Sequence, residues 1–518
     1  MKNIYSCFSV FLLMTSVVLF GGCSDSDKIS KKIIEYENGV NITPSEGVNL
    51  YGFIGDEDHN PISGVVVSDG FSSTVTNEKG VYEMVRNEKS TLVYYSTPSD
   101  YEVNVESSAV CMASFYQSII ADKERYDFKL TRLINEENDF TLLCIGDPQV
   151  KEEAQIQRFR DEIMDDIKDL KAVSSKPIYA IAMGDMVHDK PNLLESMKIA
   201  IGSVGIPVFT IIGNHDKVAS LDSDEPRNAD LFCKTYGPLN YSFDRGNVHF
   251  VCLDNVLYTD ASSYSAGFTD EQVEWLKSDL QYVSKSKMIV LSYHMPMRNS
   301  NNIVIRNKTR ILEQFEGFAG VHLMCGHTHY NDNFEMSSPI SAYEHIHAAS
   351  CGAWWKSVIN GDGTPNGYAV YEISGSQMNS WYYKAAKFDK SHQFRLHWGD
   401  TVFGAVNGGY SYGKPNYTLI ANVWNADDSW VMEVYLDGVL KGSMKKLAIK
   451  KDAWSMGYHI GMLDLSTSTY TTTTNHLYYY NVKDSYTDLK VVIKDRFGNV
   501  YEETKVVTTL DTAEKYLN

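Results

Sequence analysis

The sequence lacks an excess of positive charge. Its 47 lysines and arginines stand against 66 aspartates and glutamates, which gives a formal net charge of −19 at pH 7. A chain of this charge repels the phosphate backbone of DNA and RNA, so we expect no nucleic acid duplex as a partner. The acidic residues are spread along the chain, which indicates solubility more than a binding function.

Cysteine is scarce, and its spacing is irregular. The chain of 518 residues contains eight cysteines, and no two of them form a Cys-x-x-Cys pair. This excludes a small domain built on a disulfide framework, and we predict no disulfide. Cys144, Cys252 and Cys325 fall within predicted strands, where we expect buried thiols. The motifs described below match neither a His-Glu-x-x-His motif nor a serine-nucleophile elbow, so a peptidase or amidase is a weak alternative.

Long hydrophobic runs are absent apart from one at the N-terminus. The run from Phe8 to Phe20 follows Lys2 and is too short to span a bilayer. It ends at Gly21-Gly22-Cys23, which resembles a bacterial lipoprotein signal cleaved before Cys23 and acylated there. The following Ser24-Asp25-Ser26-Asp27 resembles the surface-export tether of Bacteroidetes-type lipoproteins. We therefore expect an extracytoplasmic protein that is lipid-anchored in the bacterial envelope, with the outer membrane favoured. An ordinary secretory signal is the alternative.

The length predicts two to four domains. Short strands and turns flank a central region in which strands alternate with helices, so the predicted fold class is multidomain α/β plus β. The first flank has a pattern similar to carboxypeptidase-regulatory-like sandwiches, and the last carries an Asp437-Gly438 hairpin signal. The predicted segments are a signal peptide (1–22), a lipidated tether (23–46), an N-terminal β-sandwich (47–134), a central domain (138–375) and a C-terminal β-sandwich (376–518).

Five apolar runs in the central region each end abruptly in polar residues. Such runs predict buried strands, and ligands bind at the carboxyl edge of open α/β sheets. Carboxylate, amide and imidazole groups bind divalent metals at neutral pH. If the five strands lie side by side, seven candidate metal ligands converge: Asp147, Gln149, Asp185, Asn214, His294, His327 and His329.

Taken in order, G-D-x-Q, G-D, G-N-H-D, H-x-P and G-H-x-H resemble the motifs of calcineurin-like metallophosphoesterases, over roughly Asp139 to Ser374. The resemblance implies a two-sheet sandwich flanked by helices and two divalent ions. It also implies hydrolysis of a phosphomonoester or phosphodiester through a metal-bridged water or hydroxide. The implied ligands of the first ion are Asp147, Gln149, Asp185 and His329, and those of the second are Asp185, Asn214, His294 and His327.

Two residues next to the ligands are the predicted catalytic groups. His215 directly follows Asn214 and could stabilise the transition state or protonate the leaving oxygen. Asp216 is predicted to orient His215. The family usually has a histidine where this chain has Gln149, and an amide oxygen favours Mn²⁺ over a redox iron. We therefore expect Mn²⁺, with Mg²⁺, Zn²⁺ or iron as alternatives.

The substrate is expected to be a small phosphorylated molecule. His188, Trp354 and Trp355 are candidates for contacting it, and the structural alternative for the two tryptophans is a core pair beneath a turn. His249 is predicted to be a strand residue without a functional role. The rival function is an extracytoplasmic glycan- or ligand-binding lipoprotein on a degenerate phosphoesterase scaffold, which Gln149 favours. The sequence does not indicate an oligomeric state.

Overall fold

The computed structural model describes residues 39–219, 225–298, 304–404 and 409–510. The chain divides into two compact units, Met1–Asn41 and Ile42–Asn518, and every element below belongs to the second. The predicted signal peptide, Cys23 and most of the tether lie outside the described residues. Within the described part of the chain, no helix combines the length and apolarity needed to cross a membrane.

The first sheet of the central region carries three of the five predicted strands. Its strand order is β10-β9-β8-β19-β20, with β8, β9 and β10 parallel to one another and β19 antiparallel to β8. The parallel strands are apolar along almost their whole length because both of their faces are covered. The bounds are β8 (Asp139–Ile145), β9 (Ile178–Ala182), β10 (Val208–Thr210), β19 (Gly367–Ser374) and β20 (Gln377–Ala385).

The second sheet carries the other two predicted strands, in the order β11-β12-β15-β16-β18-β17. Strands β12, β15, β16 and β18 are parallel, and a tight turn at Gly246 joins β11 to β12 as an antiparallel pair. The bounds are β11 (Tyr241–Arg245), β12 (Val248–Cys252), β15 (Met288–Ser292), β16 (Gly320–Cys325), β17 (Asp332–Met336) and β18 (Ala342–Ile346).

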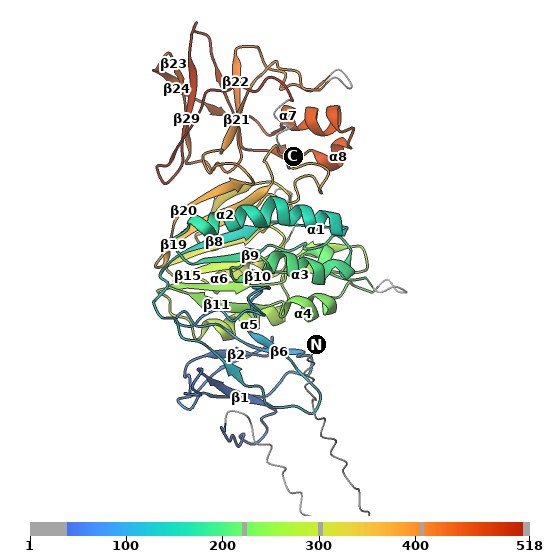
Figure 1. The fold of residues 1–518 in the computed structure, drawn as a ribbon, viewed down its shortest axis with the longest axis vertical. Helices are drawn as coiled ribbons and strands as arrows, with labels where there is room; N and C mark the ends of the chain where they lie inside the picture. The colour runs from blue at the N-terminus through green and yellow to red at the C-terminus, as the bar shows by residue number, and fades with distance from the viewer. Residues whose placement is uncertain (1–38, 220–224, 299–303, 405–408, 511–518) are drawn as a thin grey trace, which may run out of the picture. The chain divides into compact units, whose positions relative to one another are not determined.

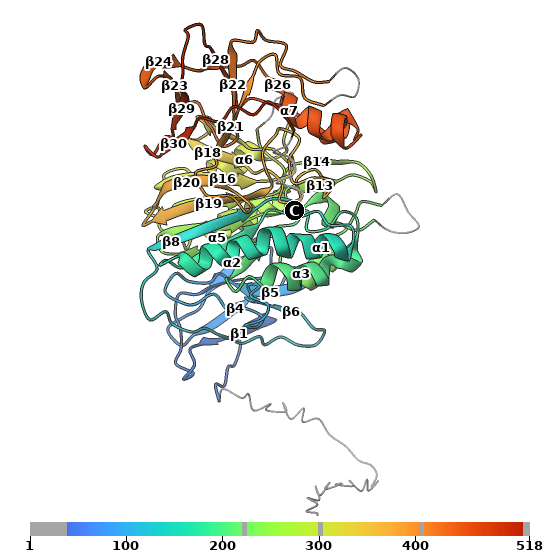
Figure 2. The ribbon, with the colours of Figure 1, turned by 45° about the horizontal axis from the view of Figure 1, so that its top comes forward.

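Three apolar clusters hold the central region together. One contains residues of both sheets, including Leu142 of β8 and Phe250 of β12. A second packs α1 (Glu153–Phe159), α2 (Asp165–Val173) and α3 (Leu194–Gly202) against the first sheet, and Figures 1 and 2 both show these helices over one face of it. The third packs α5 (Asp270–Leu280) and α6 (Lys308–Glu313) against the second sheet. The prediction of a mixed α/β domain is confirmed.

Apolar spacing and a capping box position two helices of the central region. Ile156, Phe159 and Ile163 are buried on one face of a helical stretch whose middle, Arg160–Met164, is a π-turn. Thr269 caps α5: its hydroxyl oxygen accepts from the Gln272 N–H at 3.2 Å, and the Gln272 side chain accepts from the Thr269 N–H at 2.8 Å. The remaining central elements are α4 (Asp230–Tyr236), β13 (Val256–Tyr258) and β14 (Tyr264–Ala266).

The N-terminal region forms two small sheets, in the orders β4-β1-β7 and β3-β2-β5-β6. Its buried residues, such as Leu50 and Val67, share one apolar cluster with residues of both central sheets, so its core is continuous with theirs. The bounds are β1 (Leu50–Gly55), β2 (Val66–Ser68), β3 (Ser73–Val75), β4 (Val81–Met84), β5 (Leu92–Tyr95), β6 (Tyr116–Ser118) and β7 (Phe128–Lys129).

The C-terminal region contains sheets ordered β21-β22-β28-β25 and β24-β23-β29-β30, with a short β26-β27 pair. The predicted boundary at residue 375 is wrong, because β20 lies beyond it and pairs with β19 of the first central sheet. Gly375 lies in the tight turn between these two strands, with a φ of +59°. The bounds are β21 (Phe394–Trp398), β22 (Thr418–Val423), β23 (Val431–Leu436), β24 (Val439–Ser443), β25 (Lys445–Lys446), β26 (Lys450–Lys451), α7 (Ala453–Met456), α8 (Thr467–Tyr470), β27 (Thr473–Thr474), β28 (Leu477–Asn481), β29 (Leu489–Lys494) and β30 (Val500–Glu503).

Candidate metal centre

The seven candidate ligands come from the loops that follow β8, β9, β10, β15 and β16. The loops meet across the two sheets: the His327 N–H donates to both Asp147 carboxylate oxygens at 3.0 Å, and the His215 N–H donates to Asp185 Oδ1 at 2.8 Å. His294 Nδ1 lies 2.8 Å from the Met183 carbonyl oxygen of the first sheet. The carboxyl ends of strands from both sheets therefore bring together side chains from five separate parts of the chain.

Glycines inside the motifs make this close approach feasible. A Cβ atom at Gly213 would lie 2.1 Å from Asp185 Oδ1, and one at Gly326 would lie 2.4 Å from Asp147 Oδ2. Both distances are far below van der Waals contact, so any side chain at either position would push a ligand loop away. The glycines of G-N-H-D and G-H-x-H are thus required by the space beside the ligands.

The ligand loops also hold a left-handed backbone that residues with a Cβ rarely adopt. Such conformations cost free energy and persist where the surrounding structure imposes them, often at functional sites. Five of the seven candidates show it, with φ angles of +37° (Asp147), +45° (Gln149), +52° (Asp185), +69° (His327) and +57° (His329). The strain is concentrated on the candidate ligands.

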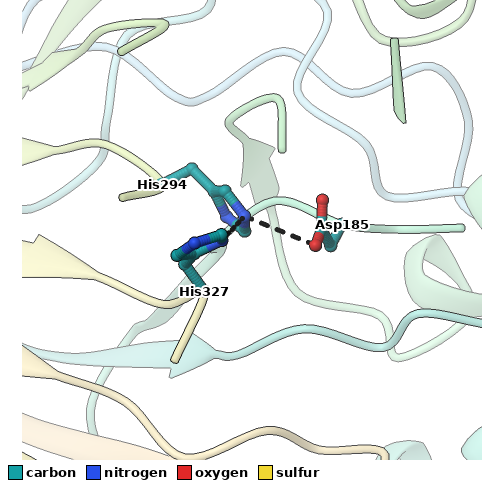
Figure 3. A group of neighbouring side chains, drawn as sticks. All are labelled: Asp185, His294 and His327. Carbon is teal, nitrogen blue, oxygen red and sulfur yellow. Dashed lines mark hydrogen bonds and ion pairs between the residues drawn. The ribbon is translucent and has the colours of Figure 1, made fainter. Parts of the chain in front are cut away.

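Asp185, His294 and His327 form the tightest group, and Figure 3 shows their side chains turned toward one another. His294 Nε2 lies 3.4 Å from Asp185 Oδ2 and 3.2 Å from His327 Nδ1. Asn214 Oδ1 lies 3.1 Å from His294 Nε2 and 3.0 Å from His327 Nδ1. Four potential ligand atoms thus face a common point, the arrangement expected around a cation.

The other predicted ligands adjoin this group. His329 Nε2 lies 3.6 Å from Asp147 Oδ1, and the Gln149 amide nitrogen donates to Asp185 Oδ2 at 2.8 Å. The Gln149 amide oxygen is buried and has no hydrogen-bond partner. A buried oxygen without a donor is costly in a protein interior, and a bound cation would satisfy it. The residues present therefore fit a divalent metal site.

Burial sets the protonation of these groups. Burial raises the pKa of Asp147 to about 8, an effect that His294 opposes and the neighbouring Asp185 strengthens. Burial lowers the pKa values of His327 and His329 to about 3, which keeps both imidazoles neutral, as metal ligation requires. The pKa of His294 moves the other way, to about 10, because Asp185 and Asp147 outweigh its burial. A cation bound here would replace the proton on His294.

The predicted catalytic residue His215 lies at the rim of the centre, with about a quarter of its side chain exposed. Its ring stacks on His188, with centroids 4.0 Å apart and an interplanar angle of 16°. His215 Nδ1 lies 3.1 Å from Asp189 Oδ2, and Asp189 also pairs with Arg227. Although burial opposes it, the Asp189 and Asp185 carboxylates raise the pKa of His215.

The prediction that Asp216 orients His215 is wrong. Both Asp216 oxygens accept backbone N–H groups, from Val187 at 3.0 Å and Gly213 at 2.9 Å, so Asp216 fixes the loops. The carboxylate next to His215 belongs to Asp189, which sequence reasoning missed. Its position four residues after Asp185 was the only available signal.

The two adjacent tryptophans have different environments. Trp355 is buried in the cluster beneath α1, and its indole N–H donates to the Pro148 carbonyl oxygen at 2.7 Å, so the structural alternative holds for it. Trp354 is half-buried, and its ring centroid lies 4.7 Å from that of His329. Of the two tryptophans, Trp354 therefore remains a candidate for contacting a substrate, and His188, which stacks on His215, remains one as well.

Three family models match the chain and together cover most of its second unit. They are the N terminal of calcineurin-like phosphoesterase at residues 50–133, calcineurin-like phosphoesterase at residues 140–331, and the C terminal of calcineurin-like phosphoesterase at residues 344–501. The central region thus has the metallophosphoesterase fold. The chain carries the N-terminal, catalytic and C-terminal domains of the calcineurin-like phosphoesterases.

Individual relatives are distant. The chain is 25% identical over 141 residues to serine/threonine-protein phosphatase CPPED1 of Pongo abelii, covering 25% of this chain and 44% of the relative. It is 29% identical over 171 residues to purple acid phosphatase 15 of Arabidopsis thaliana, covering 30% of this chain and 29% of the relative. The chain thus spans less than half the length of these curated relatives. A dimetal phosphatase from Danio rerio is a similar solved structure, with 14% identity, a TM-score of 0.33, and coverage of 48% of this chain and 96% of that one.

Proposed function

We propose that the protein is a dinuclear metal-dependent hydrolase that cleaves a phosphomonoester or a phosphodiester. The observation that carries this proposal is the convergence of carboxylate, amide and imidazole groups at the carboxyl ends of strands from both central sheets, with an unpartnered Gln149 oxygen among them. Two divalent cations would activate a water molecule and neutralise charge on the phosphoryl group. The family match and the phosphatase relatives support a hydrolase.

The positions of the candidate ligands suggest which residues would hold each cation. Asp147, Gln149 and His329 would hold one cation, with Asp185 shared between the two. Asn214, His294 and His327 would hold the second. The buried carboxylates supply the negative charge that two neighbouring cations require.

His215 would supply a proton or a positive charge at the rim. Asp189 lies 3.1 Å from its Nδ1, which favours the imidazolium and fixes the plane of the ring. The raised pKa of His215 keeps a larger fraction protonated near neutral pH. A protonated imidazole beside the centre can donate to the leaving oxygen.

We further propose Mn²⁺ as the preferred ion, because Gln149 offers a neutral oxygen where the family usually has imidazole. The apoprotein would be reconstituted with Mn²⁺, Mg²⁺, Zn²⁺ or Fe²⁺ and compared with a Gln149→His variant. We expect Mn²⁺ to give the highest turnover in the wild type and the preference to weaken in the variant. Full wild-type activity with iron and zinc alone would contradict the preference.

The central test measures metal content and hydrolysis on one preparation of the chain. With Mn²⁺ supplied, we expect about two ions per chain and hydrolysis of 4-nitrophenyl phosphate, bis(4-nitrophenyl) phosphate, or both. His327→Ala should lower kcat/KM roughly 10³-fold, and His59→Ala is a matched control because His59 is exposed in the N-terminal region. Absence of both metal and turnover would favour the rival function, a binding lipoprotein on a degenerate scaffold, for which the substituted Gln149 is the one supporting feature.

The proposal also covers the domain architecture and the attachment of the protein to a membrane. We propose that the two central sheets form the two-sheet sandwich of the family and that the terminal regions are β-sandwiches. We also propose extracytoplasmic attachment to a bacterial membrane through a lipid on Cys23. Mass spectrometry of the mature N-terminal peptide tests the attachment, and an unmodified Cys23 in the membrane fraction would contradict it.

A further inference from the structure

A cavity of about 580 Å³ opens beside the candidate metal centre. His327 belongs to both: its Nδ1 faces Asn214 and His294, and the residue also lines the cavity. A phosphoryl group at the ligands would therefore have this cavity next to it. Its volume lies within the usual range for small-molecule sites.

The walls of the cavity are largely apolar and aromatic. Tyr264 and Tyr330 contribute rings, and Tyr264 meets His327 edge-on, with centroids 6.2 Å apart. Met295, Ile305 and Ile449 contribute aliphatic surface. Tyrosine rings next to aliphatic side chains suit a flat ring with an apolar face.

The described lining of the cavity offers an anion no cationic side chain without an anionic partner. Arg298 and Asp332 are the only charged residues in its described lining, and they form an ion pair with each other. Arg298 also lies over the Phe334 ring, 4.7 Å from its centroid, and the Asn475 amide donates to Asp332 Oδ1 at 2.9 Å. A second phosphate or a carboxylate placed here would lose its hydration without gaining a cation.

One wall of the cavity comes from the C-terminal domain. Ile449 directly precedes β26, and Thr473 and Thr474 form β27, which pairs with β26 through Lys450 and Lys451. Ile449 is 68% exposed, so its side chain is accessible at the cavity wall. The same domain also contacts Trp354: the ring centroids of Tyr470 and Trp354 lie 5.6 Å apart. Trp354 in turn adjoins His329, the second histidine of G-H-x-H.

We propose that this cavity binds the leaving group of the substrate, that this group is an uncharged organic alcohol bearing a ring, and that the β26–β27 segment determines its size. The inference rests on the proposed phosphoesterase function and specifies its substrate class. Esters whose leaving group carries further phosphates, such as nucleoside polyphosphates, are disfavoured.

The experiment uses the full chain with Mn²⁺ and two esters that differ in the leaving group, 1-naphthyl phosphate and ethyl phosphate. The corresponding diesters replace them if the wild type cleaves only diesters. Ile449→Trp and Thr473→Trp place an indole at the mouth of the cavity. Val439→Trp is the matched control, because Val439 is 58% exposed in the same domain and does not line the cavity. Binding of the product 1-naphthol, followed by its fluorescence, is an independent readout.

We expect at least one cavity variant to lower the ratio of kcat/KM for the naphthyl ester over the ethyl ester about tenfold relative to the wild type. Binding of 1-naphthol should weaken by a similar factor, and Val439→Trp should change neither quantity. Hydrolysis of both esters with an unchanged ratio and unchanged naphthol binding in both variants would overturn the inference. Naphthol binding that the variants weaken, without hydrolysis of any ester, would overturn the proposed function and leave the cavity assignment standing.

Discussion

The central domain contains two buried clusters of acidic and imidazole groups, and they differ in how completely their atoms are paired. In the first, His249 of β12 lies between two carboxylates, with Nδ1 2.8 Å from Asp244 and Nε2 2.9 Å from Asp279. The Lys287 ammonium donates to the second Asp244 oxygen at 2.6 Å. Each ring nitrogen of His249 thus has its own partner.

The second cluster is the candidate metal centre, where pairing is incomplete. The facing nitrogens of His294 and His327 lie 3.2 Å apart, and both crowd the same Asn214 oxygen. The Gln149 oxygen has no partner at all. These atoms need a further positive group, whereas the atoms around His249 do not.

The contrast shows which observation distinguishes a functional cluster from a structural one. Neighbouring carboxylates overcome burial in both clusters, raising the pKa of His249 to about 9 and that of His294 to about 10. A perturbed pKa therefore does not separate them. Unpartnered ligand atoms and left-handed backbone distinguish the two clusters, because both features occur at the second cluster.

The strongest test of the contrast is His327→Ala. Loss of a ligand should remove several kcal/mol of transition-state stabilisation, roughly a 10³-fold fall in kcat/KM. Metal content should fall with it, as measured by elemental analysis of the purified protein. Full metal content and turnover in this variant would show that the incomplete cluster is not a metal site.

His215→Ala should have the next largest effect, because it removes the proposed proton donor but no ligand. We expect kcat to fall about 10²-fold, at the lower end for general acid–base catalysis. Metal content should stay at the wild-type level, which separates this variant from His327→Ala. A parallel loss of metal would instead make His215 a ligand or a structural residue.

Asp189→Asn should have a smaller effect, because Asp189 acts on His215 and not on the substrate. We expect about a tenfold fall in kcat, typical of outer-shell positions. The Asp189 carboxylate contributes to the raised pKa of His215, so the alkaline limb of the pH–rate profile should move to lower pH. An unmoved alkaline limb would contradict this positioning role.

His249→Gln should leave turnover intact and change stability. Because the folded-state pKa of about 9 exceeds the ordinary value of 6.5, the contribution of His249 is fully present below pH 6.5 and is lost as pH rises through 9. The free energy of unfolding should fall by about 3 kcal/mol over that range in the wild type. Urea denaturation at several pH values should show a much smaller fall in the variant, and an equal fall would exclude His249 as the cause.

Much of the fold could be predicted because strand ends carry strong local signals. Apolar runs mark β8, β9, β10, β15 and β16. Four of these runs stop at glycine and the run of β15 stops at His294, and the ligand loops follow them directly. The capping box at Thr269, which begins α5, is a local signal of the same kind, since its hydrogen bonds join residues three apart.

The site predictions failed where interacting residues are distant in sequence, or where residues adjacent in sequence lie in different environments. Asp189 contacts His215 across two loops, and no local pattern distinguishes it from Asp216. Trp354 and Trp355 are adjacent, yet one adjoins His329 and the other enters the core. The cavity wall from β26–β27 depends on a segment more than a hundred residues beyond the last ligand, so it could not be inferred from the motifs.

The hydrogen bonds from the His327 N–H to Asp147 join residues 180 positions apart in the sequence. During synthesis, a nascent chain that ends before His327 lacks part of the ligand set, and the intervening strands must assemble before Asp147 and His327 meet. A cation that requires the complete set can therefore be captured only by a domain that has finished folding. The metals available in the compartment where folding ends, and not those at the ribosome, would decide which ions the enzyme receives.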